Sequence, residues 1–139
     1  MNKDCLFCKI ANKVIPSNIV YEDEDVIAFL DISQITVGHT LVVSKKHYDS
    51  FLSTPPEIVN KVMRIAQKIG IILIHDFKAK GINILTNCGE AAGQSIEHFH
   101  VHVIPRYIAR DGFKIEMIKN EDLSTLNLPA IATEIKEKL

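Results

Sequence analysis

Three of the six histidines in this sequence lie at alternating positions, in the segment His98-Phe99-His100-Val101-His102. Side chains of a β-strand point alternately to its two faces, so this spacing places the three imidazoles on one face. The apolar residues between them would enter the core on the other face. Threonine or lysine would suit a solvated face equally well, so the choice of histidine indicates chemistry.

Two kinds of chemistry compete for these histidines: metal binding, and covalent or acid–base catalysis. Along a strand that rises ~3.3 Å per residue, His98 and His102 begin ~13 Å apart, whereas ligands of one zinc ion lie within ~4 Å of each other. At most two neighbouring histidines can therefore share a metal. The third needs another purpose.

The loop before the histidines, residues 89–95 (GEAAGQS), favours catalysis. Gly89 and Gly93 let the backbone approach a ligand closely, while Gln94 and Ser95 offer hydrogen-bond donors. A loop of this composition can present its N–H groups as a nest for an anion. Together, the loop and the histidine segment predict a catalytic site for an anionic ligand.

The pair Cys5-x-x-Cys8 is the second chemical feature. Two thiolates at this spacing form half of a structural zinc site, and the alternatives are an inert reduced pair and a redox pair. The chain has three cysteines, whereas a disulfide framework would need an even number. The third, Cys88, is expected to be a small buried side chain.

Hydrophobic periodicity and turn residues predict the elements that position these groups. Residues 18–32 (NIVYEDEDVIAFLDI) indicate two strands around an acidic turn at 22–25, and residues 38–47 (GHTLVVSKKH) indicate a third. Apolar residues at helical spacing predict one long helix over 55–77. Residues 81–89 and 95–105 predict two more strands joined by a hairpin of about seven residues, and residues 128–139 a closing C-terminal helix. This order predicts an α+β fold with an antiparallel sheet of about five strands.

Composition limits the class of protein. We expect a single domain over residues 1–139, because no repeat, low-complexity tract or linker divides the chain. A net charge of −1 and a pI near 6.6 argue against a broad basic face for nucleic acid. The N-terminus lacks the pattern of a signal peptide, and no apolar run reaches the length of a membrane span. We therefore expect a cytoplasmic protein that binds neither nucleic acid nor membrane.

At this point the sequence resembles a known family. The segment His98-Phe99-His100-Val101-His102-Val103-Ile104 fits the alternating histidine motif of the histidine triad (HIT) superfamily, and the preceding GQS is similar to the Hint branch. The resemblance extends over residues 5–106, through CLFCKI, IPSNIVYEDEDVIAFLDIS, GHTLVVSKKH and NILTNCGEAAGQSIEHFHVHVIPR. It is weaker in the C-terminal segment, residues 107–139. The resemblance implies a HIT fold.

The resemblance also implies a nucleotide-phosphate hydrolase with a covalent nucleotidyl-histidine intermediate. His100 would be the nucleophile, and a backbone carbonyl would hold its Nδ1–H so that the Nε2 lone pair points outward. His102 and His39 match histidines that lie against the phosphate, and Ser95 matches a hydroxyl near the leaving atom. The transferase branch of the superfamily has glutamine at the third motif position, so His102 favours hydrolysis over transfer.

When the family's site residues are matched one by one to this sequence, the resemblance implies a purine nucleotide site. An apolar wall would hold the base, a carboxylate would bind the ribose hydroxyls, and the remaining residues would contact sugar or phosphate. The residues implied are Leu6, Phe7, Ile10, Asp31, Ile32, Asn87, Gly93, Gln94, Ser95, His100 and His102. Plain core packing is the alternative for Leu6, Phe7 and Ile10, and a turn position is the alternative for Asp31.

Bacterial relatives with the cysteine pair resemble zinc proteins, and the likeness implies a structural zinc held by Cys5, Cys8, His47 and His98, with no metal required for the chemistry. The resemblance further implies a homodimer in which two sheets continue across a two-fold axis. Two other classes of function stay open at this stage. One is a nucleotide-binding adaptor or sensor with weak residual hydrolase activity, and the other is a zinc-stabilised interaction domain.

Overall fold

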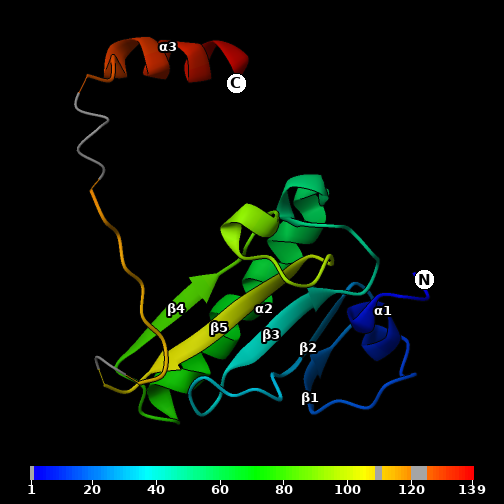
Figure 1. Ribbon diagram of the computed structural model, residues 1–139. Coiled ribbons are helices and arrows are strands. Elements are labelled where there is room, and N and C mark those ends of the chain that lie inside the picture. The colour runs from blue at the N-terminus through cyan, green and yellow to red at the C-terminus, as the bar shows by residue number, and fades with distance from the viewer. Residues whose placement is uncertain (1, 109–110, 120–124) are drawn as a thin grey trace.

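The computed structural model describes residues 2–108, 111–119 and 125–139. Five antiparallel strands form one sheet in the order β1-β2-β3-β5-β4 (Figure 1). In chain order, the elements are α1 (Leu6–Ala11), β1 (Ile19–Glu22), β2 (Val26–Leu30), β3 (Thr40–Ser44), the 3-10 turn η1 (Phe51–Ser53), α2 (Pro56–His75), β4 (Gly81–Leu85), the 3-10 turn η2 (Glu90–Ala92), β5 (His100–Arg106) and α3 (Leu128–Lys138). The predicted α+β fold, with its five strands, long helix and C-terminal helix, is confirmed.

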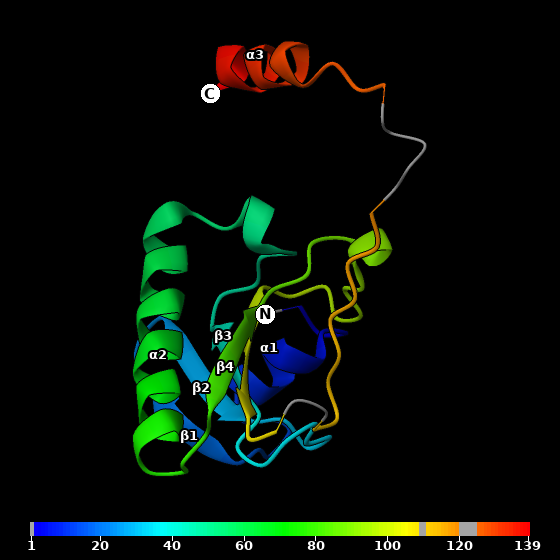
Figure 2. The ribbon, with the colours of Figure 1, turned by 90° about the vertical axis from the view of Figure 1, so that its left-hand side faces the viewer.

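Each face of the sheet packs against one helix, as Figure 2 shows edge-on. The long helix α2 covers one face, where its buried Val62, Ile65 and Leu73 contact side chains from β2, β3 and β5. The short helix α1 covers the other face through Phe7, Cys8 and Ile10. The alternation of β5 divides its residues between these layers: Val101 and Val103 belong to the core under α2, as expected.

The connection from β4 to β5 differs from the expected short hairpin. Strand β5 begins at His100, and residues 86–99 form a long loop that contains η2. The reason is a different set of backbone partners: the Phe99 N–H donates to the carbonyl of Tyr48 (2.7 Å), and the Ser44 N–H donates to the carbonyl of Phe99 (3.4 Å). His98 therefore precedes the strand and lies beside the segment that follows β3.

Helix α1 was not predicted from the sequence, because its six residues are too few to display a helical period. A side-chain cap marks its start: the Cys5 sulfur accepts a hydrogen bond from the Cys8 N–H (3.4 Å). The cysteine spacing therefore also defines the first turn of the helix, and α1 presents Phe7 and Ile10 to the sheet.

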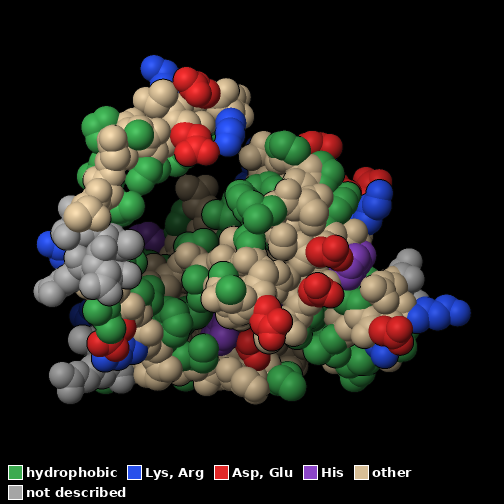
Figure 3. Space-filling view, turned by 45° about the horizontal axis from the view of Figure 1, so that its top comes forward, with side chains coloured by type: hydrophobic (Ala, Val, Ile, Leu, Met, Phe, Trp, Pro, Cys, Tyr) green, Lys and Arg blue, Asp and Glu red, His purple; other side chains and the backbone are tan. Residues whose placement is uncertain are grey.

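The C-terminal helix forms but does not close the body. None of the residues of α3 is buried, and the helix stands apart from the sheet in both ribbon views and in the space-filling view (Figures 1, 2 and 3). Leu128, Ile131 and Ile135 are exposed. None of the helices in the described part of the chain combines the length and the apolar character that a membrane span requires.

The segment after β5 is fastened to the loop between β2 and β3. Asp111 accepts hydrogen bonds from Arg106 Nε and from the backbone N–H of Tyr107, both at 2.5 Å, and the Tyr107 hydroxyl donates to the carbonyl of Val37 (2.6 Å). Gly112 has a φ of +83° and packs directly on the backbone of Ile35, where an added Cβ would lie 2.5 Å from the carbonyl oxygen. Only glycine fits this contact.

Gly112→Ala is therefore expected to lower the free energy of unfolding by about 2–4 kcal/mol, because it combines backbone strain with a clash against main chain. Gly93→Ala is the matched control, since Gly93 is left-handed, with a φ of +90°, but an added Cβ would meet no heavy atom closer than 3.5 Å. The control should cost about 1–2 kcal/mol, from backbone strain alone. Urea unfolding of both variants measures the difference, and equal losses would show that the contact with Ile35 contributes nothing.

Candidate active site and metal centre

A cavity of about 300 Å³ lies between α1 and the sheet. Its walls are mostly apolar, and histidines from β5 stand at one side of it. Its lining consists of Leu6, Phe7, Ile10, Ile15, Pro16, Ser17, Phe29, Leu30, Asp31, Ile32, Leu41, Ser95, Ile96, His100 and His102. An apolar cavity with a few converging polar groups is the usual form of a small-ligand site.

His100 has the geometry expected of a nucleophile. Its Nδ1 lies 2.6 Å from the carbonyl oxygen of His98, so Nδ1 holds the proton and donates it to that oxygen. The lone pair is then on Nε2, on the opposite side of the ring. Burial lowers the pKa of His100 below its ordinary value, which keeps the ring neutral and nucleophilic near pH 7. The edge of this ring packs on Phe7, with the ring centroids 4.9 Å apart.

His102 is oriented by a second histidine behind it. The backbone N–H of Ile35 donates to His39 Nδ1 (3.4 Å), so the His39 proton resides on Nε2, which lies 2.9 Å from His102 Nδ1. His102 Nδ1 accepts this hydrogen bond, and its own proton therefore resides on Nε2. Burial, with the nearby rings of His100 and His39, lowers the pKa of His102 to about 4. A neutral imidazole with a fixed N–H donor is suited to stabilise charge on a ligand.

This arrangement corrects the role expected for His39. The ring is 1% exposed and does not line the cavity, so it does not lie against a phosphate. It instead orients His102, and its Nε2 also lies 3.7 Å from Asp31 Oδ2. Burial lowers the pKa of His39, which favours the neutral tautomer that this chain of hydrogen bonds requires.

The cavity brings together most of the residues that the sequence implied for nucleotide binding. Those that line it are Leu6, Phe7, Ile10, Asp31, Ile32, Ser95, His100 and His102. The sequence analysis did not name Ile15, Pro16, Ser17, Phe29, Leu30, Leu41 or Ile96. Strand alternation could have found two of them, because Phe29 and Leu41 are register partners on β2 and β3 and face α1.

The glycine-rich loop contributes differently from the expectation. The N–H groups of Gly93 and Gln94 donate within the loop, to the carbonyls of Glu90 (2.9 Å) and Gly89 (3.1 Å). The two N–H groups are therefore already paired, so they do not form the expected anion nest. Asn87 also lies outside the cavity, where its amide donates to the carbonyl of Gly93 (3.3 Å). Ser95 alone of the GQS residues lines the cavity.

The Gln94 side chain links two backbone segments through hydrogen bonds. Its amide nitrogen donates to the carbonyls of Asp49 (2.6 Å) and Ile96 (3.0 Å), and its oxygen accepts from the N–H of Gly89 (2.8 Å). Gln94 thus ties the loop to the segment that follows β3. Gly93, Gln94 and Ser95 line a second, more open pocket of about 610 Å³, together with Gly89, Glu90 and Glu97.

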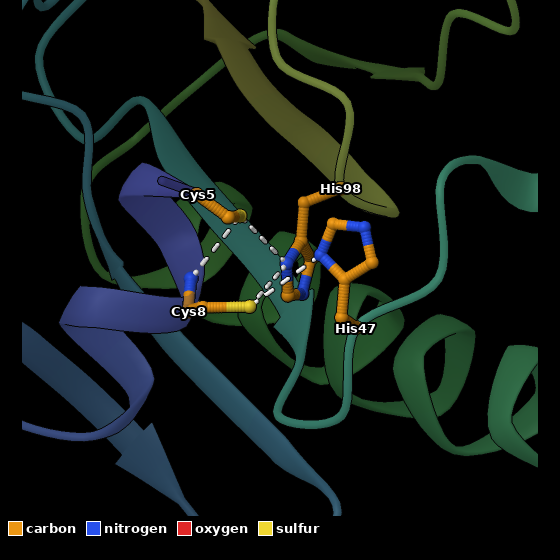
Figure 4. A group of neighbouring side chains, drawn as sticks. All are labelled: Cys5, Cys8, His47 and His98. Carbon is orange, nitrogen blue, oxygen red and sulfur yellow. Dashed lines mark hydrogen bonds between the residues drawn. The ribbon is translucent and has the colours of Figure 1, made fainter. Parts of the chain in front are cut away.

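Four potential metal ligands converge on the other side of α1. Cys5, Cys8, His47 and His98 present sulfur and Nδ1 atoms that all lie within 4.8 Å of one another (Figure 4). The Nδ1 of His98 lies 3.3 Å from the Cys5 sulfur and 3.5 Å from that of Cys8, and His47 Nδ1 lies 3.4 Å from the Cys8 sulfur. These separations suit four donors around one tetrahedral ion.

The outer nitrogens of both imidazoles are fixed as metal-binding histidines require. His98 Nε2 donates to the carbonyl of Ser44 (2.6 Å), and His47 Nε2 lies 2.9 Å from the Asp49 carboxylate. Each of these bonds places the proton on Nε2 and leaves Nδ1 free to bind a metal. Burial lowers the pKa of His98 to about 4, so its ring is neutral near pH 7. The Cys2His2 donor set is typical of structural zinc.

The fold and site together define an α+β protein with a histidine-lined cavity of small-ligand size and an adjacent cluster of two cysteines and two histidines, the donor set of a metal site. The HIT domain family matches residues 12–109, and the chain therefore belongs to the HIT family. A crystal structure of a HIT family protein from Bacillus anthracis superposes with a TM-score of 0.91 at 43% identity, covering 99% of this chain and 98% of that one.

Two further relatives bear on chemistry. A Zn-bound histidine triad family protein from Mycobacterium smegmatis superposes with a TM-score of 0.75 at 34% identity, covering 96% of this chain and 97% of that one. The Adenylylsulfatase HINT3 of Arabidopsis thaliana is 36% identical over 106 residues, which is 76% of this chain and 54% of the plant protein.

Protein purified without chelator is expected to contain about one zinc per chain by elemental analysis. Cys5→Ser and His98→Ala should each lose the metal and lower the Tm, because bound structural zinc contributes folding free energy. Cys88→Ser is the control, since Cys88 lies outside the cluster, and it should keep the metal. If His98→Ala still contained one zinc per chain, His98 would not be a ligand. If the wild-type protein contained no metal, the cysteines would be packing residues only.

Proposed function

We propose that the protein hydrolyses a purine nucleotide conjugate, such as a nucleoside phosphoramidate, to the nucleoside monophosphate through a covalent intermediate on His100. The observation that carries this proposal is the 2.6 Å bond from His100 Nδ1 to the His98 carbonyl, on a residue that lines the cavity. A protein that only bound nucleotide would need the cavity but not a neutral imidazole held in its nucleophilic tautomer.

In the first step, His100 Nε2 attacks the α-phosphorus, and the bond from phosphorus to the leaving nitrogen or oxygen breaks. The Nε2–H of His102 stabilises the charge that develops on the phosphoryl oxygens, and the Ser95 hydroxyl stands near the leaving group. The leaving group departs with the bonding electrons and takes up a proton from solvent. In the second step water attacks the phosphorus and loses a proton to solvent, the bond to His100 breaks with its electron pair returning to Nε2, and the nucleoside monophosphate is released.

The rest of the cavity fits the nucleotide portion. Phe7, Ile10 and Phe29 offer flat or branched apolar surface for a base, and the Asp31 carboxylate can accept hydrogen bonds from a ribose. The plant relative named as an adenylylsulfatase supports an enzyme in this family rather than an adaptor. The neighbouring Cys/His cluster is proposed to bind a structural zinc that takes no part in the chemistry.

We also propose a homodimer. Strand β4 is an edge of the sheet, and apolar side chains on it and on α2 are exposed, among them Ile71, Ile72 and Ile84. Ile71 and Ile84 border a groove between the helix and the edge strand. A second copy that continues the sheet across β4 would bury this surface and pair the edge.

His100→Ala is expected to abolish release of AMP from an adenosine phosphoramidate, while calorimetry still detects AMP binding, because the apolar and ribose contacts remain. His102→Ala should reduce kcat by a smaller factor, about 10²–10³, since it removes charge stabilisation rather than the bond-forming atom. Wild-type protein quenched during turnover should gain one nucleotidyl group by intact-mass analysis. A His100→Ala variant with near wild-type turnover would refute the mechanism.

The homodimer predicts that Ile84→Lys shifts the chain toward monomer in analytical ultracentrifugation at micromolar concentration, because it places a charge in the buried edge. Val14→Lys is the control: Val14 is also an exposed apolar residue, but it lies outside the groove between α2 and β4. This control should sediment as wild type. A wild-type protein that sediments as a monomer would overturn the proposal.

A further inference from the structure

Ser17 has a hydroxyl group that the fold itself does not use. Among the residues that the structure describes, its Oγ is the single buried side-chain oxygen or nitrogen without a hydrogen-bond partner. Ser17 precedes β1, and it lines the same cavity as His100. A buried hydroxyl without a partner loses its bonds to water and gains nothing in return, so it disfavours the folded state.

Most residues of the cavity wall near Ser17 are apolar. Ile15 and Pro16 precede Ser17 in the sequence and line the cavity, as do Phe29 and Leu30 of the neighbouring strand β2. The backbone here is fixed, since the Leu30 N–H donates to the carbonyl of Asn18 (3.0 Å). Alanine would satisfy the packing without an unpaired oxygen. A hydroxyl at this position is explained if a ligand supplies the missing partner.

The sheet order indicates which part of a nucleotide comes near. His100 and His102 are on β5, and the sheet continues through β3 and β2 to β1. Three strand spacings separate β5 from β1, about 14 Å. Asp31 directly follows β2, between these ends. With the phosphate at the β5 histidines and the ribose at Asp31, the base reaches the Ser17 end of the cavity.

We propose that the Ser17 hydroxyl hydrogen-bonds the polar edge of the six-membered ring of a purine base, and so determines base specificity in an otherwise apolar subsite. A hydroxyl has one donor and two acceptor lone pairs, so it can meet a ring nitrogen or an exocyclic group of adenine or guanine. It selects bases with a polar edge over apolar bicycles of the same shape. The inference rests on the proposed nucleotide site.

The test is Ser17→Ala with two independent measurements. Calorimetry should show AMP and GMP affinity lowered about threefold to tenfold, the range expected for one neutral hydrogen bond. Benzimidazole riboside 5′-monophosphate keeps the bicyclic shape, ribose and phosphate but has no hydrogen-bonding atom on its six-membered ring. Its affinity should be the same for both proteins.

The second measurement is unfolding without ligand. Ser17→Ala should be as stable as wild type or more stable, because it removes an unpaired buried oxygen. Thr54→Val is the control: its buried hydroxyl donates to the carbonyl of Ser50 (2.7 Å), outside the cavity, so this change should lower stability and leave AMP affinity unchanged. A loss of stability in Ser17→Ala like that of the control would assign the hydroxyl to the fold and overturn the proposal.

The ligand series separates the possible failures. If wild-type protein binds no purine nucleotide, the proposed function fails with the inference. If wild type binds AMP and Ser17→Ala binds it equally well, the inference alone fails. If Ser17→Ala lowered the affinity for AMP but not for 2′-deoxy-AMP, the Ser17 hydroxyl would contact the sugar. That result would refute the base contact.

Discussion

The hydrogen bond from His100 Nδ1 to the His98 carbonyl is the constraint on which the rest of the site depends. It selects the tautomer of His100, and it can form because His98 lies just before β5 rather than within a regular strand. The side chain of His98 is held in turn by the Ser44 carbonyl through Nε2. The carbonyl of His98 therefore orients the proposed nucleophile, while its imidazole belongs to the Cys5, Cys8, His47 and His98 cluster. The position of this one residue affects both sites.

Helix α1 connects the same two sites from the opposite side. Its Cys8, with the N-cap Cys5, points to the metal cluster, while Leu6, Phe7 and Ile10 form cavity wall. Six residues are too few for a helix to be stable by itself in water. The apolar contacts of Phe7 and Ile10 with the sheet hold it, and a metal at the cysteines would add a second attachment. The position of the apolar wall is thus linked to the state of the cysteine pair.

Rigid loops complete the site. The Gln94 side chain joins the loop of residues 89–95 to the Asp49 carbonyl. The Gln34 side chain braces the loop that precedes β3, because its amide donates to the carbonyls of Asp31 (2.5 Å) and His39 (2.7 Å). Both glutamine side chains bond to backbone, so both amide N–H donors of each are already used. Preorganised loops of this kind keep catalytic groups in place without a cost at the moment of reaction.

Local patterns in the sequence, namely alternating residues in the strands and the helical period over α2, determined the five strands and the long helix. The family resemblance added eight of the residues that line the cavity, and the other seven were not foreseen. Side-chain periodicity reports which face a residue occupies, but not which atom becomes its partner. Tertiary structure decided that His39 stands behind His102, that Gln94 binds backbone, and that β5 begins at His100, since each depends on contacts between segments distant in the chain. The unpaired Ser17 hydroxyl is also a feature that only the tertiary structure decided, because the partners of a serine depend on the residues that fold around it.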